Sequence, residues 1–258
     1  MAGNFFISFS NAMQLRTLFI FITLILFNFT ESIAYSSNDT VAEIQNNDSL
    51  KLVTDTATLK EETKATKGLT DEDYQIVADS LGIEVATIKS IVEIETGRCR
   101  EGIIEPGIPL VNFDASIFKS FMRRANKSYS KYVNSPAFKL PNTRKYGTFG
   151  KAQWARLESA RKIDKTIAEK ATFWGMFQIG GFNWKKCGCA SLEEFVDRMS
   201  TSEFEQLNLF AEFCKNSNLV KYLKDKNWAA FAYRYNGPGY KRHNYDGRLR
   251  RAYNKFKK

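Results

Sequence analysis

The sequence predicts a mostly α-helical fold built from many short helices. Apolar residues recur at the i, i+3, i+4 spacing of a helix face, and the segments with this spacing begin at capping residues and end at glycine or turn residues. We find no alternation of apolar and polar residues long enough to predict a substantial sheet, and no internal repeat. The expected architecture is therefore a multi-helix domain.

The first 34 residues have the composition of an export signal. Arg16 precedes an apolar run from Leu18 to Phe27, and Ser32 to Ala34 supply the small residues that a signal peptidase requires. The run is much shorter than the roughly 20 residues that span a bilayer. We expect cleavage after Ala34, export to the periplasm or beyond, and no stable membrane anchor afterwards. Met13 is an alternative start.

The chain is basic, with a formal net charge of +10. Loss of residues 1–34 removes one arginine and one glutamate, so the mature charge is unchanged. Such a protein is attracted to nucleic acid, anionic lipid or an anionic cell wall. Its basic residues are scattered except at Arg248–Arg251 and Lys255–Lys258, so nucleic acid is not the expected partner.

Four cysteines remain after export, in a compartment that permits disulfides. A bridge between Cys187 and Cys189 is disfavoured by their one-residue gap, so a single bridge from Cys99 or Cys214 to this pair is expected. The only histidine is His243 and no C-x-x-C spacing exists. We therefore expect neither a metal site nor another cofactor.

The folded domain is expected over 68–258, after a disordered polar tether at 35–67. Thr70 can cap a helix that ends at Gly82 and whose apolar positions are Tyr74, Val77, Ala78 and Leu81.

A second helix is predicted from Glu84 to Thr96, with Gly97 ending it. Helical spacing places one group of residues on a single face: Val85, Ile88, Ile91, Val92 and Glu95. Glu93 falls with Lys89 on the outer face. The phase of this helix therefore buries Glu95 and not Glu93.

Further helices are predicted along the rest of the chain. Capping boxes start two of them, at Ser191 and Ser202, and strong turn residues at Asn236–Gly239 stop the last. The others are expected at 115–124, 157–170, 219–223 and 228–235.

Glu95 is the first candidate for chemistry. Burial on an apolar face raises the pKa of a carboxyl group, and the negative end of the helix dipole adds to this. Such a group stays protonated near neutral pH, which is what an acid that protonates a glycosidic oxygen requires. The alternative is a structural glutamate at a helix end, partly exposed or paired with Arg98.

Two later segments suit a saccharide cleft. Trp174–Trp184 is rich in aromatic residues and glycine and contains Gln178, and Trp228–Tyr240 is an aromatic helix followed by a rigid turn. Sugar rings pack on aromatic faces, and amides bond hydroxyl and acetamido groups. Each segment taken alone could equally be a core turn or a core helix.

Together the three segments resemble a known pattern. Glu95-Thr96-Gly97, then Gly175-Met176-Phe177-Gln178-Ile179, then Tyr235-Asn236-Gly237-Pro238-Gly239 resemble the signature segments of goose-type lysozymes and lytic transglycosylases. The N-acetylmuramidase family of bacteriophage endolysins is more similar still. Its domain opens like Leu69–Asp73 and ends like Tyr235–Tyr240, so the resemblance covers Gly68 to the C-terminus.

This resemblance implies a lysozyme-like domain with a substrate cleft, monomeric, acting on peptidoglycan glycan strands. It implies hydrolysis of the β-1,4 bond between N-acetylmuramic acid and N-acetylglucosamine, with Glu95 as acid and base. By the same likeness Phe177 and Gln178 belong to the cleft wall, and Tyr235 and Asn236 to the substrate-contacting end.

The second catalytic group is open. Phe113-Asp114-Ala115-Ser116 stands where the family usually has Phe-Glu-Arg-His. Asp114 is the favoured carboxylate, Glu101 and Glu105 are nearby in sequence, and the substrate's own acetamido group could serve instead. Two alternatives to hydrolysis are a lytic transglycosylase with the same acid and a catalytically silent peptidoglycan-binding domain.

Overall fold

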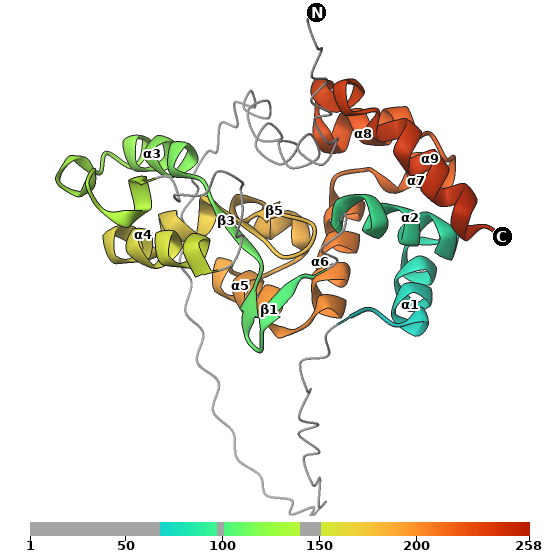
Figure 1. Ribbon diagram of the computed structural model, residues 1–258, viewed down its shortest axis with the longest axis horizontal. Coiled ribbons are helices and arrows are strands. Elements are labelled where there is room, and N and C mark those ends of the chain that lie inside the picture. The colour runs from blue at the N-terminus through green and yellow to red at the C-terminus, as the bar shows by residue number, and fades with distance from the viewer. Residues whose placement is uncertain (1–67, 97–100, 140–150) are drawn as a thin grey trace, which may run out of the picture.

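The structure, a computed structural model, describes residues 68–96, 101–139 and 151–258. The predicted signal at 1–34 and tether at 35–67 lie outside these residues, as do Gly97, Arg98 and Cys99. Within them the molecule is mostly helical, which confirms the predicted fold class (Figure 1).

The α-helices occur in the following order: α1 (Asp71–Leu81), α2 (Val85–Thr96), α3 (Ala115–Arg124), α4 (Lys151–Lys170), α5 (Leu192–Thr201), α6 (Glu203–Asn216), α7 (Val220–Lys224), α8 (Trp228–Asn236) and α9 (Tyr245–Phe256). Short 3-10 helices connect them: η3 (Ser130–Tyr132), η4 (Pro136–Phe138), η5 (Gly181–Cys187) and η6 (Pro238–His243). Figure 1 shows α3 and α4 at one end of the molecule and α1, α2, α8 and α9 at the other.

Two small antiparallel sheets lie between these ends. The first pairs β1 (Ile103–Glu105) with β2 (Ile108–Pro109), and the second has the order β3 (Val111–Phe113), β4 (Thr172–Trp174), β5 (Ile179–Gly180). Val111 pairs with Trp174, which pairs with Ile179. The sequence did not predict these strands, because two or three residues are too few to show a period of two.

The first two helices form as predicted. Thr70 and Asp73 make a capping box, in which Thr70 Oγ1 accepts from the Asp73 N–H at 3.2 Å and Asp73 accepts from the Thr70 N–H at 2.7 Å. Gly82 ends α1 in the left-handed region at φ 60°. α2 then packs against α1 and along α9.

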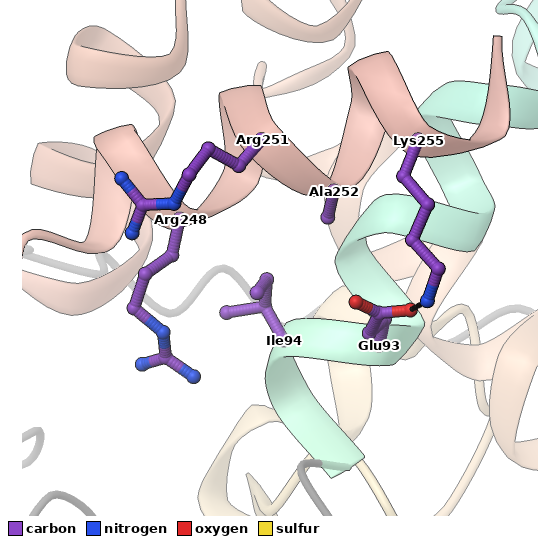
Figure 2. Close-up of a pocket in the computed structure, with 6 residues that line it drawn as sticks. All are labelled: Glu93, Ile94, Arg248, Arg251, Ala252 and Lys255. Carbon is purple, nitrogen blue, oxygen red and sulfur yellow. Dashed lines mark hydrogen bonds and ion pairs between the residues drawn. The ribbon is translucent and has the colours of Figure 1, made fainter.

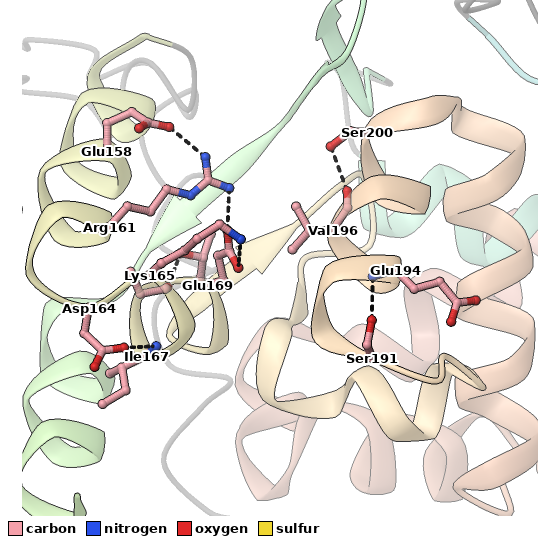
Figure 3. A network of polar contacts seen from close by, with 12 residues as sticks. Glu158, Arg161, Asp164, Lys165, Ile167, Glu169, Ser191, Glu194, Val196 and Ser200 are labelled. Carbon is pink, nitrogen blue, oxygen red and sulfur yellow. Dashed lines mark hydrogen bonds and ion pairs between the residues drawn. The ribbon is translucent and has the colours of Figure 1, made fainter.

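The long helix α4 differs from its prediction. It begins earlier than residue 157 and is broken at Asp164, whose backbone is extended (φ −160°, ψ 106°). Asp164 then accepts a hydrogen bond from the Ile167 N–H at 2.9 Å (Figure 3), so its carboxylate caps the second half of the helix.

A charged network holds α4 to the second sheet. Glu169 is 2% exposed and lies 3.0 Å from both the Arg161 guanidinium and the Lys165 ammonium (Figure 3). Arg161 also faces the rings of Trp154 and Trp174, 5.5 and 5.8 Å from their centroids. The network therefore fixes Trp174, the last residue of β4.

The C-terminal helix α9 was not predicted. Its buried residues are Tyr245, Leu249, Ala252 and Tyr253, which follow the i, i+4, i+7, i+8 pattern of a helix face. The many basic residues in this stretch obscured the pattern. α9 closes the domain by packing on α2 and α8.

Over the described ranges, no helix has the length and hydropathy needed to cross a membrane.

Candidate active site

Glu95 lies in the last turn of α2, on its buried face, as its helical phase predicts. It is 4% exposed, and its Oε1 atom has no hydrogen-bond partner among the described residues. Burial raises the pKa of Glu95 to about 8, against an opposing effect of Arg248. The carboxyl group is therefore largely protonated at neutral pH.

Three other helices converge on this acid. Cys214 comes from α6, Tyr235 from α8 and Arg248 from α9. Burial, and then the charge of Glu95 among other groups, raises the pKa values of Cys214 and Tyr235 well above their ordinary range. Both side chains thus stay neutral. Arg248 is the cation whose charge acts on Glu95.

The motif Gly175–Gln178 forms the turn between β4 and β5. The Gln178 N–H donates to the Gly175 carbonyl at 3.1 Å, and Gln178 itself adopts a left-handed backbone at φ 48°. Left-handed backbone is unfavourable for a residue with a side chain and recurs at functional sites. Gln178 Nε2 donates to the Gly175 carbonyl at 2.8 Å, whereas its Oε1 is buried without a partner.

Gly175 is required by its surroundings. Its φ is +68°, and a Cβ there would lie 2.6 Å from Oε1 of Gln206. That oxygen accepts a hydrogen bond from the Met176 N–H at 2.8 Å, while Gln206 Nε2 donates to the Gly102 and Met199 carbonyls. Gln206 therefore holds the turn in place from α6.

Phe177 does not present its ring to a cleft. It is 2% exposed and stacks on Phe210, with ring centroids 4.3 Å apart and an interplanar angle of 14°. Its carbonyl accepts a hydrogen bond from the Tyr235 hydroxyl at 3.3 Å. The expectation that the Phe177 ring forms cleft wall is thus replaced by a supporting role, because the turn directs this side chain into the core.

Tyr235 and Asn236 end α8, as the sequence predicts. The Tyr235 ring stacks on Phe231 at 5.4 Å and meets Phe210 edge-on at 5.7 Å. Both polar atoms of the Asn236 side chain are buried and have no partner among the described residues. Buried polar atoms without partners are rare in proteins and need an explanation.

The three motif segments therefore share one property. Each contributes a polar side chain with a buried atom that has no hydrogen-bond partner within the described residues, namely Glu95, Gln178 and Asn236. Such atoms can be satisfied by a polar ligand, and amide and carboxyl groups suit a saccharide.

Glu93, two residues before Glu95, differs from it in its surroundings. Its Oε2 lies 2.6 Å from the Lys255 ammonium of α9, at the rim of a hollow between the two helices (Figure 2). Glu93 is thus a paired surface carboxylate, as its position on the outer face of α2 predicts.

Asp114 makes contacts of its own, and it is not among the groups that act on Glu95. Its carboxylate caps α3, accepting from the N–H groups of Ser116 at 2.7 Å and Ile117 at 2.9 Å, and α3 lies at the other end of the molecule from α2 (Figure 1). The role of Asp114 as the second carboxylate stays a prediction without a supporting contact.

The predicted bridge between Cys214 and the Cys187–Cys189 pair is not formed. All three cysteines are buried free thiols, and burial raises the pKa values of their thiols. Within the described residues, no group of histidine, cysteine or carboxylate side chains has the arrangement of a metal site.

The sequence did not single out Arg248 or Cys214 as neighbours of the acid. Cys214 was considered as a disulfide partner, and its proximity to Glu95 depends on tertiary packing. The apolar pattern of α9 could have placed Arg248 at the edge of the buried face of that helix, because Arg248 directly precedes the buried Leu249.

The chain is similar to proteins that are already known. The model of the N-acetylmuramidase family matches residues 84–257. Among solved structures, the chain is similar to the crystal structure of Burkholderia AP3 phage endolysin, with 34% sequence identity and a TM-score of 0.63 over 73% of this chain and 70% of that chain. None of the curated proteins compared with the chain matches it. The family match includes all three motif segments.

Proposed function

The chain belongs to the N-acetylmuramidase family of phage endolysins, and from this premise we propose that it hydrolyses the β-1,4 bond between N-acetylmuramic acid and N-acetylglucosamine, with Glu95 as the acid and base. Peptidoglycan hydrolysis in general follows from the family. The observation that supports the specific role of Glu95 is a buried carboxyl group whose Oε1 atom has no hydrogen-bond partner among the described residues and whose pKa lies near 8.

In the first step, protonated Glu95 donates its proton to the glycosidic oxygen as the bond from that oxygen to the anomeric carbon breaks. The leaving sugar departs as an alcohol, and positive charge develops at the anomeric carbon. In the second step, water adds to this carbon and the Glu95 carboxylate accepts the proton of the water. Glu95 is then protonated again.

The developing positive charge requires a stabilising group. Arg248 is the charged side chain that acts on Glu95, and a cation cannot serve. Since Asp114 caps α3, we assign this role to the acetamido group of the substrate. Its carbonyl oxygen bonds to the anomeric carbon as the leaving oxygen departs, and water displaces that oxygen again in the second step. Asn236 and Gln178, with their unused polar atoms, would orient that group.

A lytic transglycosylase is the second candidate, because it also needs a single acid. There the 6-hydroxyl of the muramic acid residue, in place of water, attacks the anomeric carbon and gives an anhydro product. Mass spectrometry of fragments from purified peptidoglycan distinguishes the two. We expect reducing ends, and anhydro ends would establish the transglycosylase.

The direct test is Glu95→Gln assayed on purified peptidoglycan. General acid catalysis contributes about 10² to 10⁴ in rate, so we expect lysis to fall by about a thousandfold while the protein still binds sacculi. Glu72→Gln makes the same change at an exposed site on α1 and should leave lysis unchanged. Full activity of a folded Glu95→Gln protein would refute the assignment. Absence of lysis by the unaltered chain, with retained binding, would instead indicate a silent binding domain.

Export also belongs to this proposal, because the substrate lies outside the cytoplasm. We propose that residues 1–34 are removed on export to the periplasm or beyond. N-terminal sequencing of the mature protein should give Tyr35 as the first residue.

A further inference from the structure

A hollow lies between α2 and α9, the helices that carry Glu95 and Arg248. It has a volume of about 230 Å³ and is lined by residues of these two helices only: Glu93, Ile94, Arg248, Arg251, Ala252 and Lys255. Ile94 and Ala252 form its apolar part, and the charged side chains surround them (Figure 2). Arg248 lines the hollow and also acts electrostatically on Glu95, so an occupant bound by Arg248 would lie near the catalytic carboxyl group.

The charges around the hollow are not balanced. Lys255 is paired with Glu93 at 2.6 Å. No salt bridge to Arg248 or Arg251 is found within the part of the chain that the structure describes, and the two guanidinium groups repel each other. Arg248 is half-buried, and Arg251 is exposed. Glu93 is taken up by Lys255, and the carboxyl group that acts on Arg248 is that of the buried Glu95. An anion bound between the two guanidinium groups would offset their repulsion.

A short acid with its carboxylate fits in this volume. The apolar part formed by Ile94 and Ala252 suits the methyl or methylene groups of such an acid.

The substrate carries a group of this kind on one of its two sugars. N-acetylmuramic acid bears a lactyl group at its 3-position, which is a free carboxylate in bare glycan and an amide in glycan that carries peptides. In the latter case the carboxylates belong to the peptide. N-acetylglucosamine has no acidic group, so a carboxylate-binding hollow would tell the two sugars apart.

We propose that the hollow between α2 and α9 is a subsite in which Arg248 and Arg251 bind a carboxylate carried by the muramic acid residue. This inference rests on the proposed function, because it names the part of the same substrate that the site recognises. Binding there would place the muramic acid residue, and no neutral sugar, at the scissile bond beside Glu95.

Arg251 is the residue to change, because it is exposed and lies farther from the chemistry than Arg248. The matched control is Arg250→Gln, which removes the same charge from the exposed surface of α9 outside the hollow. Binding is measured with fluorescently labelled glycan strands and does not depend on turnover. Three strands are compared: peptide-free strands, the same strands with lactyl carboxylates converted to methylamides, and peptide-bearing strands.

We expect Arg251→Gln to weaken binding about fivefold on carboxylate-bearing strands, with no change in the Arg250→Gln protein. An effect on peptide-free strands that disappears on amidated strands identifies the lactyl carboxylate. An effect on peptide-bearing strands alone identifies a peptide carboxylate, and both results support the subsite. Equal behaviour of Arg251→Gln and Arg250→Gln on all three strands would overturn it.

The two proposals fail in different ways. If Glu95→Gln proved fully lytic, the assigned acid would be wrong, whereas the binding comparison on α9 would still be interpretable. If Arg251→Gln bound normally, the subsite would be wrong, and the loss of lysis in Glu95→Gln would stand.

Discussion

Glu169 and Glu95 are both almost completely buried, yet their surroundings differ. Glu169 on α4 forms ion pairs with Arg161 and Lys165, each 3.0 Å away, whereas no ion pair of Glu95 is found among the described residues and its Oε1 atom accepts no hydrogen bond from them. A buried carboxylate that is paired can serve the fold, but one that is unpaired destabilises it and is retained for another reason. Burial alone therefore does not distinguish a catalytic glutamate from a structural one. The two are distinguished by whether a cation is paired with the carboxyl group.

The largest expected effect on stability is at Glu169. Glu169→Gln leaves Arg161, which is 20% exposed, without its buried counter-charge, and we expect unfolding to become about 3 kcal/mol easier. Urea denaturation measures this. Glu158→Gln removes a second partner of Arg161 that is 52% exposed, and it should change stability by less than about 1 kcal/mol. Equal effects of the two substitutions would contradict the role given to Glu169.

At Glu95 we expect the substitution to glutamine to increase stability, not to reduce it. The pKa of Glu95 is near 8 in the folded chain against 4.5 ordinarily, so between these values the folded state holds a proton that the unfolded state has lost. Stability therefore falls as pH rises from about 5 to 8. Glu95→Gln removes this dependence and should stabilise the protein at pH 8, with little gain at pH 4. Thermal unfolding at the two pH values checks this, and a destabilised variant at pH 8 would contradict it.

The same ionisation should limit activity at high pH. Since the acid must be protonated, kcat/KM should fall as pH rises through about 8, by about tenfold for each further pH unit. The measurement is the initial rate of lysis between pH 5 and 10, with stability monitored in parallel. If kcat/KM instead began to fall near pH 5, the ionisation of Glu95 would not be what limits activity.

The smallest effects are expected at Asp114, because its carboxylate caps α3. Asp114→Ala should cost about 1 kcal/mol of stability, and Asp114→Asn almost nothing, since asparagine caps equally well. Lysis by Asp114→Asn should be normal. A large loss of lysis in a stable Asp114→Asn protein would restore Asp114 as the second catalytic carboxylate.

The first two helices and the burial of Glu95 could be predicted because they depend on neighbouring residues only. Thr70, Gly82 and the apolar spacing of α2 determine local structure without reference to the rest of the chain. The same spacing separated Glu95 from Glu93, and the structure confirms this separation.

The remaining parts depend on packing that one sequence does not reveal. Phe177 was expected in a cleft, but the turn after β4 directs it onto Phe210. The proximity of Cys214 and Arg248 to Glu95 requires α6 and α9 to meet α2, and the apolar face of α9 was hidden among basic residues. Asp114 was predicted to be the second catalytic carboxylate because it stands at the position of a carboxylate in the family pattern. Such a pattern does not distinguish a helix cap from a catalytic group.

The most direct test is the pKa of Glu95 itself. Carbon-13 NMR of the protein with labelled glutamate side chains, compared with Glu95→Gln, isolates the signal of this one carboxyl group. We predict a titration midpoint of about 8, so that the group is mainly protonated at pH 7 and able to donate. A midpoint near the ordinary value of 4.5 would make Glu95 an anion at neutral pH and would contradict its role as the catalytic acid.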